Sequence, residues 1–205
     1  MTPFVRLEGI AAPLMEENVD TDIIFPARFL LITAREGLGR YAFHDRRFNA
    51  KDSECGDFIL NRPAWREARI LIADANFGCG SSREQAVWAL SGFGIGCIIA
   101  SSFGEIFEAN CYRNSLVPLT LSRDMILRLT QAAETGVEFT VDLEALTLSF
   151  DETTIAISLP DHRRQALLNG WDDTATILNT YGKEITAFEE RHAAAQSWLF
   201  DEELA

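Results

Sequence analysis

Two serines and an arginine follow a pair of glycines in the stretch Gly78-Cys79-Gly80-Ser81-Ser82-Arg83. The apolar run at residues 69–75 before it predicts a buried strand, and residues 84–90 after it predict a helix. Gly78 and Gly80 allow a tight turn and a close approach of the main chain to a ligand. Hydroxyls and a guanidinium at a helix start, where N–H groups and the positive dipole end point outward, favour anion binding. The spacing therefore predicts a carboxylate-binding catalytic turn.

A capping box is the second interpretation of this stretch. Ser81-x-x-Glu84 has the spacing at which a serine and a glutamate satisfy the first N–H groups of a helix and do nothing else. Ser102-x-x-Glu105 has the same spacing. A cap uses one hydroxyl, whereas a catalytic turn can use both serines and Arg83, which favours the catalytic interpretation. Arg83 occupies the place of the third glycine of a dinucleotide fingerprint, and no phosphate-loop motif occurs.

Composition excludes several classes of partner. The 205 residues are 47% hydrophobic, which is enough for one sizeable core. A net charge of −13 without a basic stripe argues against nucleic acid and anionic membranes as partners. No run of 18 apolar residues and no secretory signal at the N-terminus are found, so no membrane span is expected and a cytoplasmic location follows.

The cysteines and histidines predict no metal site in this chain. Neither type shows ligand spacing, and no C-x-x-C occurs. The residues concerned are Cys55, Cys79, Cys97, Cys111, His44, His162 and His192. Cys97 lies in an apolar run typical of a core strand, and Cys79 in the glycine turn is a candidate reactive thiol.

Strand and helix patterns alternate along the middle of the chain and predict an α/β fold with a mostly parallel central sheet. Strands are predicted at residues 4–10, 69–75, 95–100 and 116–121, with helices from residues 84, 104 and 122. Short antiparallel strands are predicted at 137–141, 147–150 and 154–159. The region from Ala11 is predicted to be irregular, and Gly37 and Gly39 predict a mobile loop that runs to Arg47. One domain over residues 1–205 is expected, with roughly 160–205 as a helical extension. One helix of this extension is expected to start at Pro160 and stop at Gly170, and a second, from Asp173 onward, is expected to break near Gly182.

Several blocks of the sequence, in order and at family spacing, resemble the small subunits of 3-isopropylmalate dehydratases. The blocks are Asn18–Ile24, Asn76–Glu84, Ala100–Phe107, Asn110-Cys111 and Arg163–Gly170. These subunits are similar to the swivelling C-terminal domain of aconitase, so the resemblance implies a single swivelling β/β/α-type domain. It extends from about residue 5 to about residue 180, and several ordered blocks are far more specific than one loop.

The resemblance implies a hydro-lyase that works only with a large subunit. That partner would carry a 4Fe–4S cluster, whereas this chain would bind no cofactor. The substrate would be a small dicarboxylate or hydroxy-acid, most directly isopropylmalate in leucine biosynthesis. Two alternatives remain open: a related hydratase acting on citraconate, maleate or homoaconitate, and a carboxylate-binding module without catalysis. Gln85 stands where many relatives have histidine, which bears on the exact substrate.

The resemblance also assigns roles within the site. Ser81 would be the base that takes and returns a proton next to a carboxylate. Ser82, Arg83 and, by a looser match, Arg28 would bind substrate carboxylates. The remaining candidates would shape the site: Asp20, Asp22, Gly78 and Gly80. The loop from Leu30 to Tyr41 resembles the segment that distinguishes substrates within the family.

Overall fold

The computed structural model describes residues 1–199 and divides the chain into two units, Met1–Gly170 and Trp171–Ala205. The expected single domain therefore stays a prediction, and residues 200–205 of its helical extension lie outside the described residues. All the candidate site residues belong to the first unit.

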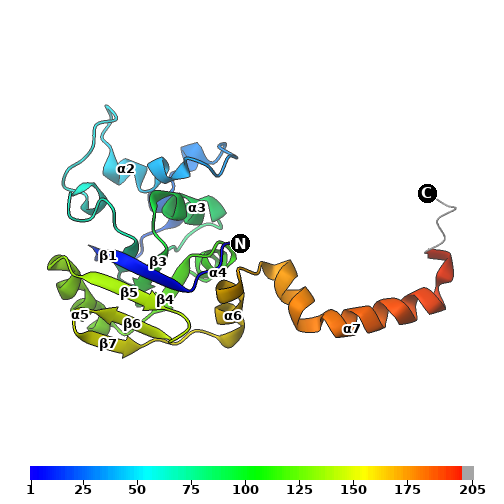
Figure 1. Cartoon of the computed structure of the whole chain (residues 1–205). Helices are drawn as coiled ribbons and strands as arrows, with labels where there is room; N and C mark the ends of the chain where they lie inside the picture. Colours follow the sequence, from blue (N-terminus) through cyan, green and yellow to red (C-terminus); the bar gives the residue numbers. More distant parts are fainter. Residues whose placement is uncertain (200–205) are drawn as a thin grey trace. The chain divides into compact units, whose positions relative to one another are not determined.

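Seven strands form one sheet in the order β4-β3-β2-β1-β5-β6-β7 (Figure 1). β1 pairs in parallel with β2, β2 with β3, and β3 with β4. β1 pairs antiparallel with β5, which continues into β6 and β7. The strands are β1 Arg6–Leu14, β2 Ile70–Ala73, β3 Cys97–Ala100, β4 Val117–Thr120, β5 Glu138–Asp142, β6 Thr147–Phe150 and β7 Thr153–Ala156. The predicted α/β fold, with a parallel sheet extended by short antiparallel strands, is confirmed.

The parallel strands are apolar because helices cover both faces of this part of the sheet. Every residue of β2 and β3 is buried. Leu71 and Ala73 of β2 pack into a core with α3 (Glu84–Phe93) and α4 (Glu105–Arg113). Ile70 and Ile72 face the other core, which contains residues of α5 (Arg123–Glu134) and α6 (Asp161–Asn169). Continuous apolar runs are typical of strands covered on both sides.

Caps define the ends of the later helices. Ser122 Oγ accepts a hydrogen bond from the Met125 N–H at 3.4 Å, and Gly170 ends α6 with φ 67°.

In the second unit, α7 (Asp173–Ala195) is kinked at Tyr181, next to the break predicted at Gly182, and the 3-10 helix η4 (Ser197–Leu199) follows. Within residues 1–199, no helix is long and apolar enough to cross a membrane.

Three of the predictions are wrong in part. The last antiparallel strand, β7, ends at Ala156 and not at residue 159. β1 does not stop at Ile10: Arg6–Ile10 pairs with β5, and the next four residues, to Leu14, pair with β2. Pro13 fits there because this half of β1 has a neighbouring strand on one side only, so a residue without an N–H is tolerated. The predicted loop up to Arg47 contains the short helices η2 (Leu38–Tyr41) and α2 (His44–Arg47). Single turns of helix leave no periodic apolar pattern for a sequence to show.

Three other short helices complete the first unit. They are α1 (Thr21–Ile24), η1 (Ala27–Phe29) and η3 (Ile59–Asn61). α1 and η1 lie in the connection between β1 and β2, which also contains η2, α2 and η3. This connection supplies one side of the candidate site.

Candidate functional site

The glycine turn lies beyond the carboxyl end of β2, between the segments that follow β1 and β3. The Gly78 N–H donates to the Val19 carbonyl at 2.7 Å, and the Thr21 N–H donates to the Cys79 carbonyl at 2.9 Å. On the other side, the Phe77 N–H donates to the Ser102 carbonyl at 3.1 Å. Carboxyl ends of parallel strands are the usual place for ligands in open α/β sheets.

Gly78 is required by both backbone conformation and space. Its φ is 74°, and a Cβ at this position would lie 2.1 Å from Cγ of Phe107. Gly80 has φ 93° but more room, since a Cβ there would lie 3.4 Å from the nearest atom, Cβ of Asp20. The two predicted glycines therefore form the turn as expected, and Phe107 of α4 leaves no room for a side chain at the first of them.

The capping-box interpretation is wrong at both places. α3 begins at Glu84, its N-cap residue is Arg83, and no side chain caps it. Glu84 instead accepts a hydrogen bond from Asn114 Nδ2 at 2.8 Å. The N-cap of α4 is Gly104, also without a side-chain cap, while Ser102 Oγ accepts from the Asn76 N–H at 2.8 Å. The exposed residues Ser81 and Ser82 precede α3 without capping it.

Arg83 and Asp22 connect the turn to α1 through an ion pair. The Arg83 side chain is 15% exposed and that of Asp22 is 52% exposed, so the guanidinium is mostly covered while its partner faces solvent. Asp20 is the N-cap of α1: its Oδ1 accepts from the Ile23 N–H at 2.7 Å. Asp20 also forms a parallel bridge with Cys79. The structure thus brings the two predicted aspartates next to the predicted turn.

The surroundings of Cys79 disfavour an activated thiol. Burial, and secondarily the nearby charge of Asp20, raise the pKa of Cys79, which disfavours a thiolate. All four cysteines are free, and Cys97 and Cys111 are fully buried. In the part of the chain that the structure describes, no three His, Cys, Asp or Glu side chains are grouped to hold a metal ion.

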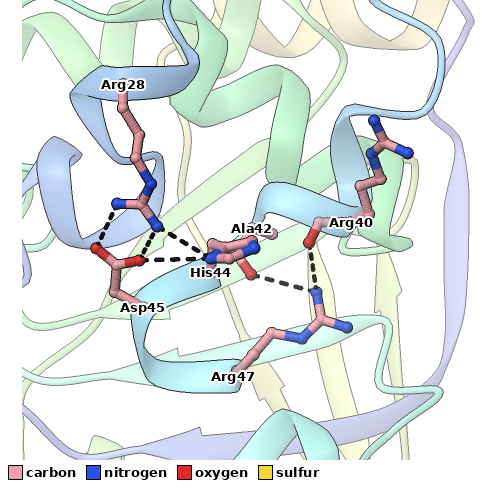
Figure 2. A network of polar contacts seen from close by, with 6 residues as sticks. All are labelled: Arg28, Arg40, Ala42, His44, Asp45 and Arg47. Carbon is pink, nitrogen blue, oxygen red and sulfur yellow. Dashed lines mark hydrogen bonds and ion pairs between the residues drawn. The ribbon is translucent and has the colours of Figure 1, made fainter. Parts of the chain in front are cut away.

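Arg28 lies at a different place, beside an open pocket of about 890 Å³. Figure 2 shows its guanidinium facing Asp45 and His44 of α2. Arg28 Nη1 donates to Asp45 Oδ2 at 2.8 Å, and Arg28 Nη2 lies 3.1 Å from His44 Nδ1. The pocket is lined by these three residues together with Phe29, Arg40 and Tyr41. Contact between Arg28 and a substrate carboxylate stays a prediction, and it requires Arg28 to exchange Asp45 for the substrate.

The Arg28–Asp45 pair predicts a measurable pH effect. The hydrogen bond from Arg28 is the largest cause that lowers the pKa of Asp45 from its ordinary value of 3.8. A carboxylate with a depressed folded-state pKa contributes stability that is present above pH 3.8 and is lost as pH falls through the lower value. In Arg28→Met, we expect the pKa of Asp45 to rise toward its ordinary value, measured by carboxyl 13C NMR titration. An unchanged titration would show that the pair is not formed in solution.

Sequence reasoning missed two residues that position the turn. The buried Thr21 donates its hydroxyl to the Ser81 carbonyl at 2.9 Å and so fixes the main chain of the candidate base. Asp74, 5% exposed, accepts from the Ala75 N–H at 2.9 Å and from Arg123 at 3.2 Å at the entry to the turn. Thr21 lies inside a block that carries the family resemblance. Its role is shown only by its hydrogen bond to Ser81, which is 60 residues further along the chain.

Comparison with known proteins agrees with this architecture. Residues 1–124 match the aconitase C-terminal domain family. The 3-isopropylmalate dehydratase small subunits of Rhizobium etli and Rhodospirillum centenum are 45% and 46% identical to this chain over 201 residues. These matches cover 97% of this chain and 99% and 98% of the two relatives. A crystal structure of 3-isopropylmalate dehydratase from Methanocaldococcus jannaschii has a TM-score of 0.64 and 26% identity, covering 90% of this chain and 99% of that one. The chain therefore belongs to the family of 3-isopropylmalate dehydratase small subunits, which has the aconitase C-terminal domain fold.

Proposed function

We propose that this chain is the small subunit of a two-subunit cytoplasmic hydro-lyase that interconverts 2-isopropylmalate and 3-isopropylmalate in leucine biosynthesis. Family membership along nearly the whole chain supports the reaction. The observation that carries the role of this subunit is the uncapped start of α3, where Ser81, Ser82 and Arg83 stand together at the carboxyl ends of parallel strands.

Ser81 is the base in this proposal. In the dehydration direction, its Oγ takes a proton from the carbon next to a carboxylate, the C–H electron pair forms the alkene, and hydroxide leaves the neighbouring carbon. In the rehydration direction, Ser81 returns the proton to the carbon that lost hydroxide, and hydroxide adds to the other. A serine alkoxide is strongly basic, so it needs nearby positive charge. The N-terminal end of α3 and the mostly covered Arg83 supply that charge.

Ser82 and Arg83 bind a substrate carboxylate in the proposed complex. Asp22 holds the Arg83 guanidinium near the turn in the free subunit, and its exposed side chain allows the pair to open when substrate arrives. Asp20, Thr21 and the turn glycines keep the Ser81 main chain in place. This arrangement positions Ser81 relative to the bound carboxylic acid substrate before reaction, which lowers the entropic part of the activation barrier.

A large subunit is the expected partner, because the relatives are named as small subunits. We expect a 4Fe–4S cluster on that partner, where an open iron would act as a Lewis acid towards the substrate hydroxyl. This chain would then contribute the base and the carboxylate contacts and hold no cofactor.

Reconstitution tests the proposal directly. This chain is mixed anaerobically with a cluster-bearing large subunit of an isopropylmalate dehydratase, and alkene formation from isopropylmalate is followed by absorbance. We expect turnover only when both chains are present. Complex formation with turnover on citraconate, maleate or homoaconitate in place of isopropylmalate would overturn the pathway but keep the subunit role. Carboxylate binding by the isolated chain, with no turnover in any complex, would favour a binding module.

The planar guanidinium of Arg83 predicts a substrate-binding defect in Arg83→Lys. Lysine keeps the charge but loses the bidentate fork, so we expect kcat/KM of the reconstituted enzyme to fall by about tenfold or more. The matched control is Arg128→Lys, a change at an exposed arginine of α5, which should leave kcat/KM unchanged. Equal rates for wild type and Arg83→Lys would remove Arg83 from the proposed site.

A further inference from the structure

Arg47 is a buried cation whose partners are carbonyl and amide oxygens. The residue is 9% exposed. Its Nη1 donates to the carbonyls of Gly39 at 3.2 Å, Arg40 at 3.4 Å and Ala42 at 3.3 Å. Figure 2 shows the guanidinium reaching from α2 toward the last two of these oxygens. Burying a charge is costly unless it is hydrogen-bonded, so these contacts are needed to keep Arg47 in place.

The carbonyls that Arg47 binds belong to the C-terminal end of η2. Carbonyl oxygens at this end of a helix carry a partial negative charge, which a cation stabilises, and the Gly39 carbonyl also accepts from the Ala42 N–H at 3.2 Å. Asn61 supports the guanidinium by accepting from Nε at 3.2 Å, and Asn61 Nδ2 donates to the Arg47 carbonyl at 2.6 Å. The ring centroids of Phe48 and Phe93 lie 5.0 Å and 4.7 Å from the Arg47 guanidinium carbon. Arg47 is thus held on several sides while it holds the turn at residues 39–42.

This turn carries two residues of the pocket wall. Arg40 and Tyr41 line the pocket beside Arg28, and the Arg40 guanidinium lies over the Tyr41 ring at 4.5 Å. Arg40 is exposed, and a guanidinium next to a phenol hydroxyl is suited to bind a carboxylate. The conformation that Arg47 imposes on the turn therefore decides where these two groups lie.

The 39–42 turn also contacts α1 and α3, the two helices that support the Ser81 turn. A Cβ on Gly39 would lie 2.2 Å from the carbonyl oxygen of Gly92, so the main chains of η2 and α3 are in direct contact. The Phe43 N–H donates at 2.8 Å to the carbonyl of Ile24, the last residue of α1. The turn is therefore held against α1 and α3 by contacts that do not involve Arg47.

We propose that Arg47 is a positioning residue for substrate binding: it fixes the 39–42 turn so that Arg40 and Tyr41 present one wall to the carboxylic acid substrate. The inference rests on the proposed function and deepens it. Because Arg47 acts through the turn and does not touch Ser81, its loss should weaken substrate binding and leave proton transfer nearly intact.

Arg47→Met, with Arg46→Met as the matched control, tests the inference by two measurements. Arg46 is the neighbouring arginine, but its side chain is 46% exposed and pairs with Glu16 at 3.2 Å. In the isolated chain, amide hydrogen exchange of Ala42 should accelerate about tenfold in Arg47→Met, while exchange of Ile72 in β2 stays unchanged. In the reconstituted enzyme, KM should rise about tenfold with kcat within about threefold of wild type, since charged hydrogen bonds to the turn are lost. Arg46→Met should match wild type in both measurements.

Each other outcome has a defined meaning. Faster exchange at Ala42 with an unchanged KM would make Arg47 a structural residue only and overturn the inference, as would a fall in kcat at constant KM. No turnover by the wild-type complex would overturn the proposed function. In that case, faster exchange at Ala42 would still support the role of Arg47 in holding the 39–42 turn, and unchanged exchange would refute that role. If Arg47→Met does not fold, Arg47→Lys takes its place, because lysine keeps the charge but cannot reproduce the guanidinium geometry, and the same KM rise is expected.

Discussion

Ser81→Ala is expected to lower kcat of the reconstituted enzyme by about 10²–10⁴-fold, the range that a positioned general base contributes. KM should change little because Ser82 and Arg83 still bind the carboxylate in our proposal. Assembly and folding should be preserved, since the exposed Ser81 caps no helix and the Thr21 hydroxyl contacts its main-chain carbonyl, which alanine retains. Anaerobic turnover assays with a fixed amount of large subunit, together with size-exclusion chromatography of the complex, provide the measurement.

Ser91→Ala is the matched control for this variant. Ser91 is an exposed serine of α3, so its replacement changes the same helix and the same functional group without reaching the turn. We expect wild-type kcat from Ser91→Ala. A complex of Ser81→Ala that assembles and retains wild-type kcat would refute the assignment of Ser81 as base. A complex that no longer assembles would instead place Ser81 in the contact with the large subunit.

Gly78→Ala is expected to destabilise the folded chain by about 2–5 kcal/mol. Two costs combine: alanine at φ 74° is strained, and its Cβ would lie 2.1 Å from Cγ of Phe107. Phe107 is 2% exposed and packs in the core against Phe77, with ring centroids 5.5 Å apart, so it has little room to move. The free energy of unfolding, measured by urea denaturation, should fall accordingly.

Gly136→Ala separates the two costs. Gly136 has a similar φ of 79°, but nothing lies within 4 Å of a Cβ built there. Only backbone strain should remain, about 1–2 kcal/mol. If Gly78→Ala and Gly136→Ala lower the free energy of unfolding equally, the contact with Phe107 does not constrain the turn. A larger loss in Gly78→Ala would show that the core of the domain dictates the turn next to Ser81.

Elements with strong local signals could be predicted from the sequence. The apolar runs at β2 and β3 predicted covered strands, and the predicted helix from residue 122 matches α5, for which the structure shows Ser122 as the cap. The end of α6 at Gly170 was also predicted, because a left-handed residue there favours glycine. The extension of β1 to Leu14 was missed, because this strand changes its partner from β5 to β2 midway. Pairing with two different strands leaves no single alternating pattern in the sequence.

The candidate site, too, could be predicted only in part from the sequence. By itself, the sequence determined the glycine turn, the position of Ser81, Ser82 and Arg83 before a helix, and the family to which these blocks point. Only the tertiary structure decided between a capped helix and an open turn, because Ser81-x-x-Glu84 satisfies the local requirements of both. It alone placed Thr21 on the Ser81 carbonyl, paired Arg28 with Asp45 and buried Arg47 against the 39–42 turn. The physical reason is that these bonds join segments brought together by packing of the whole domain, and a side chain that binds a distant main chain leaves no periodic trace in its own neighbourhood.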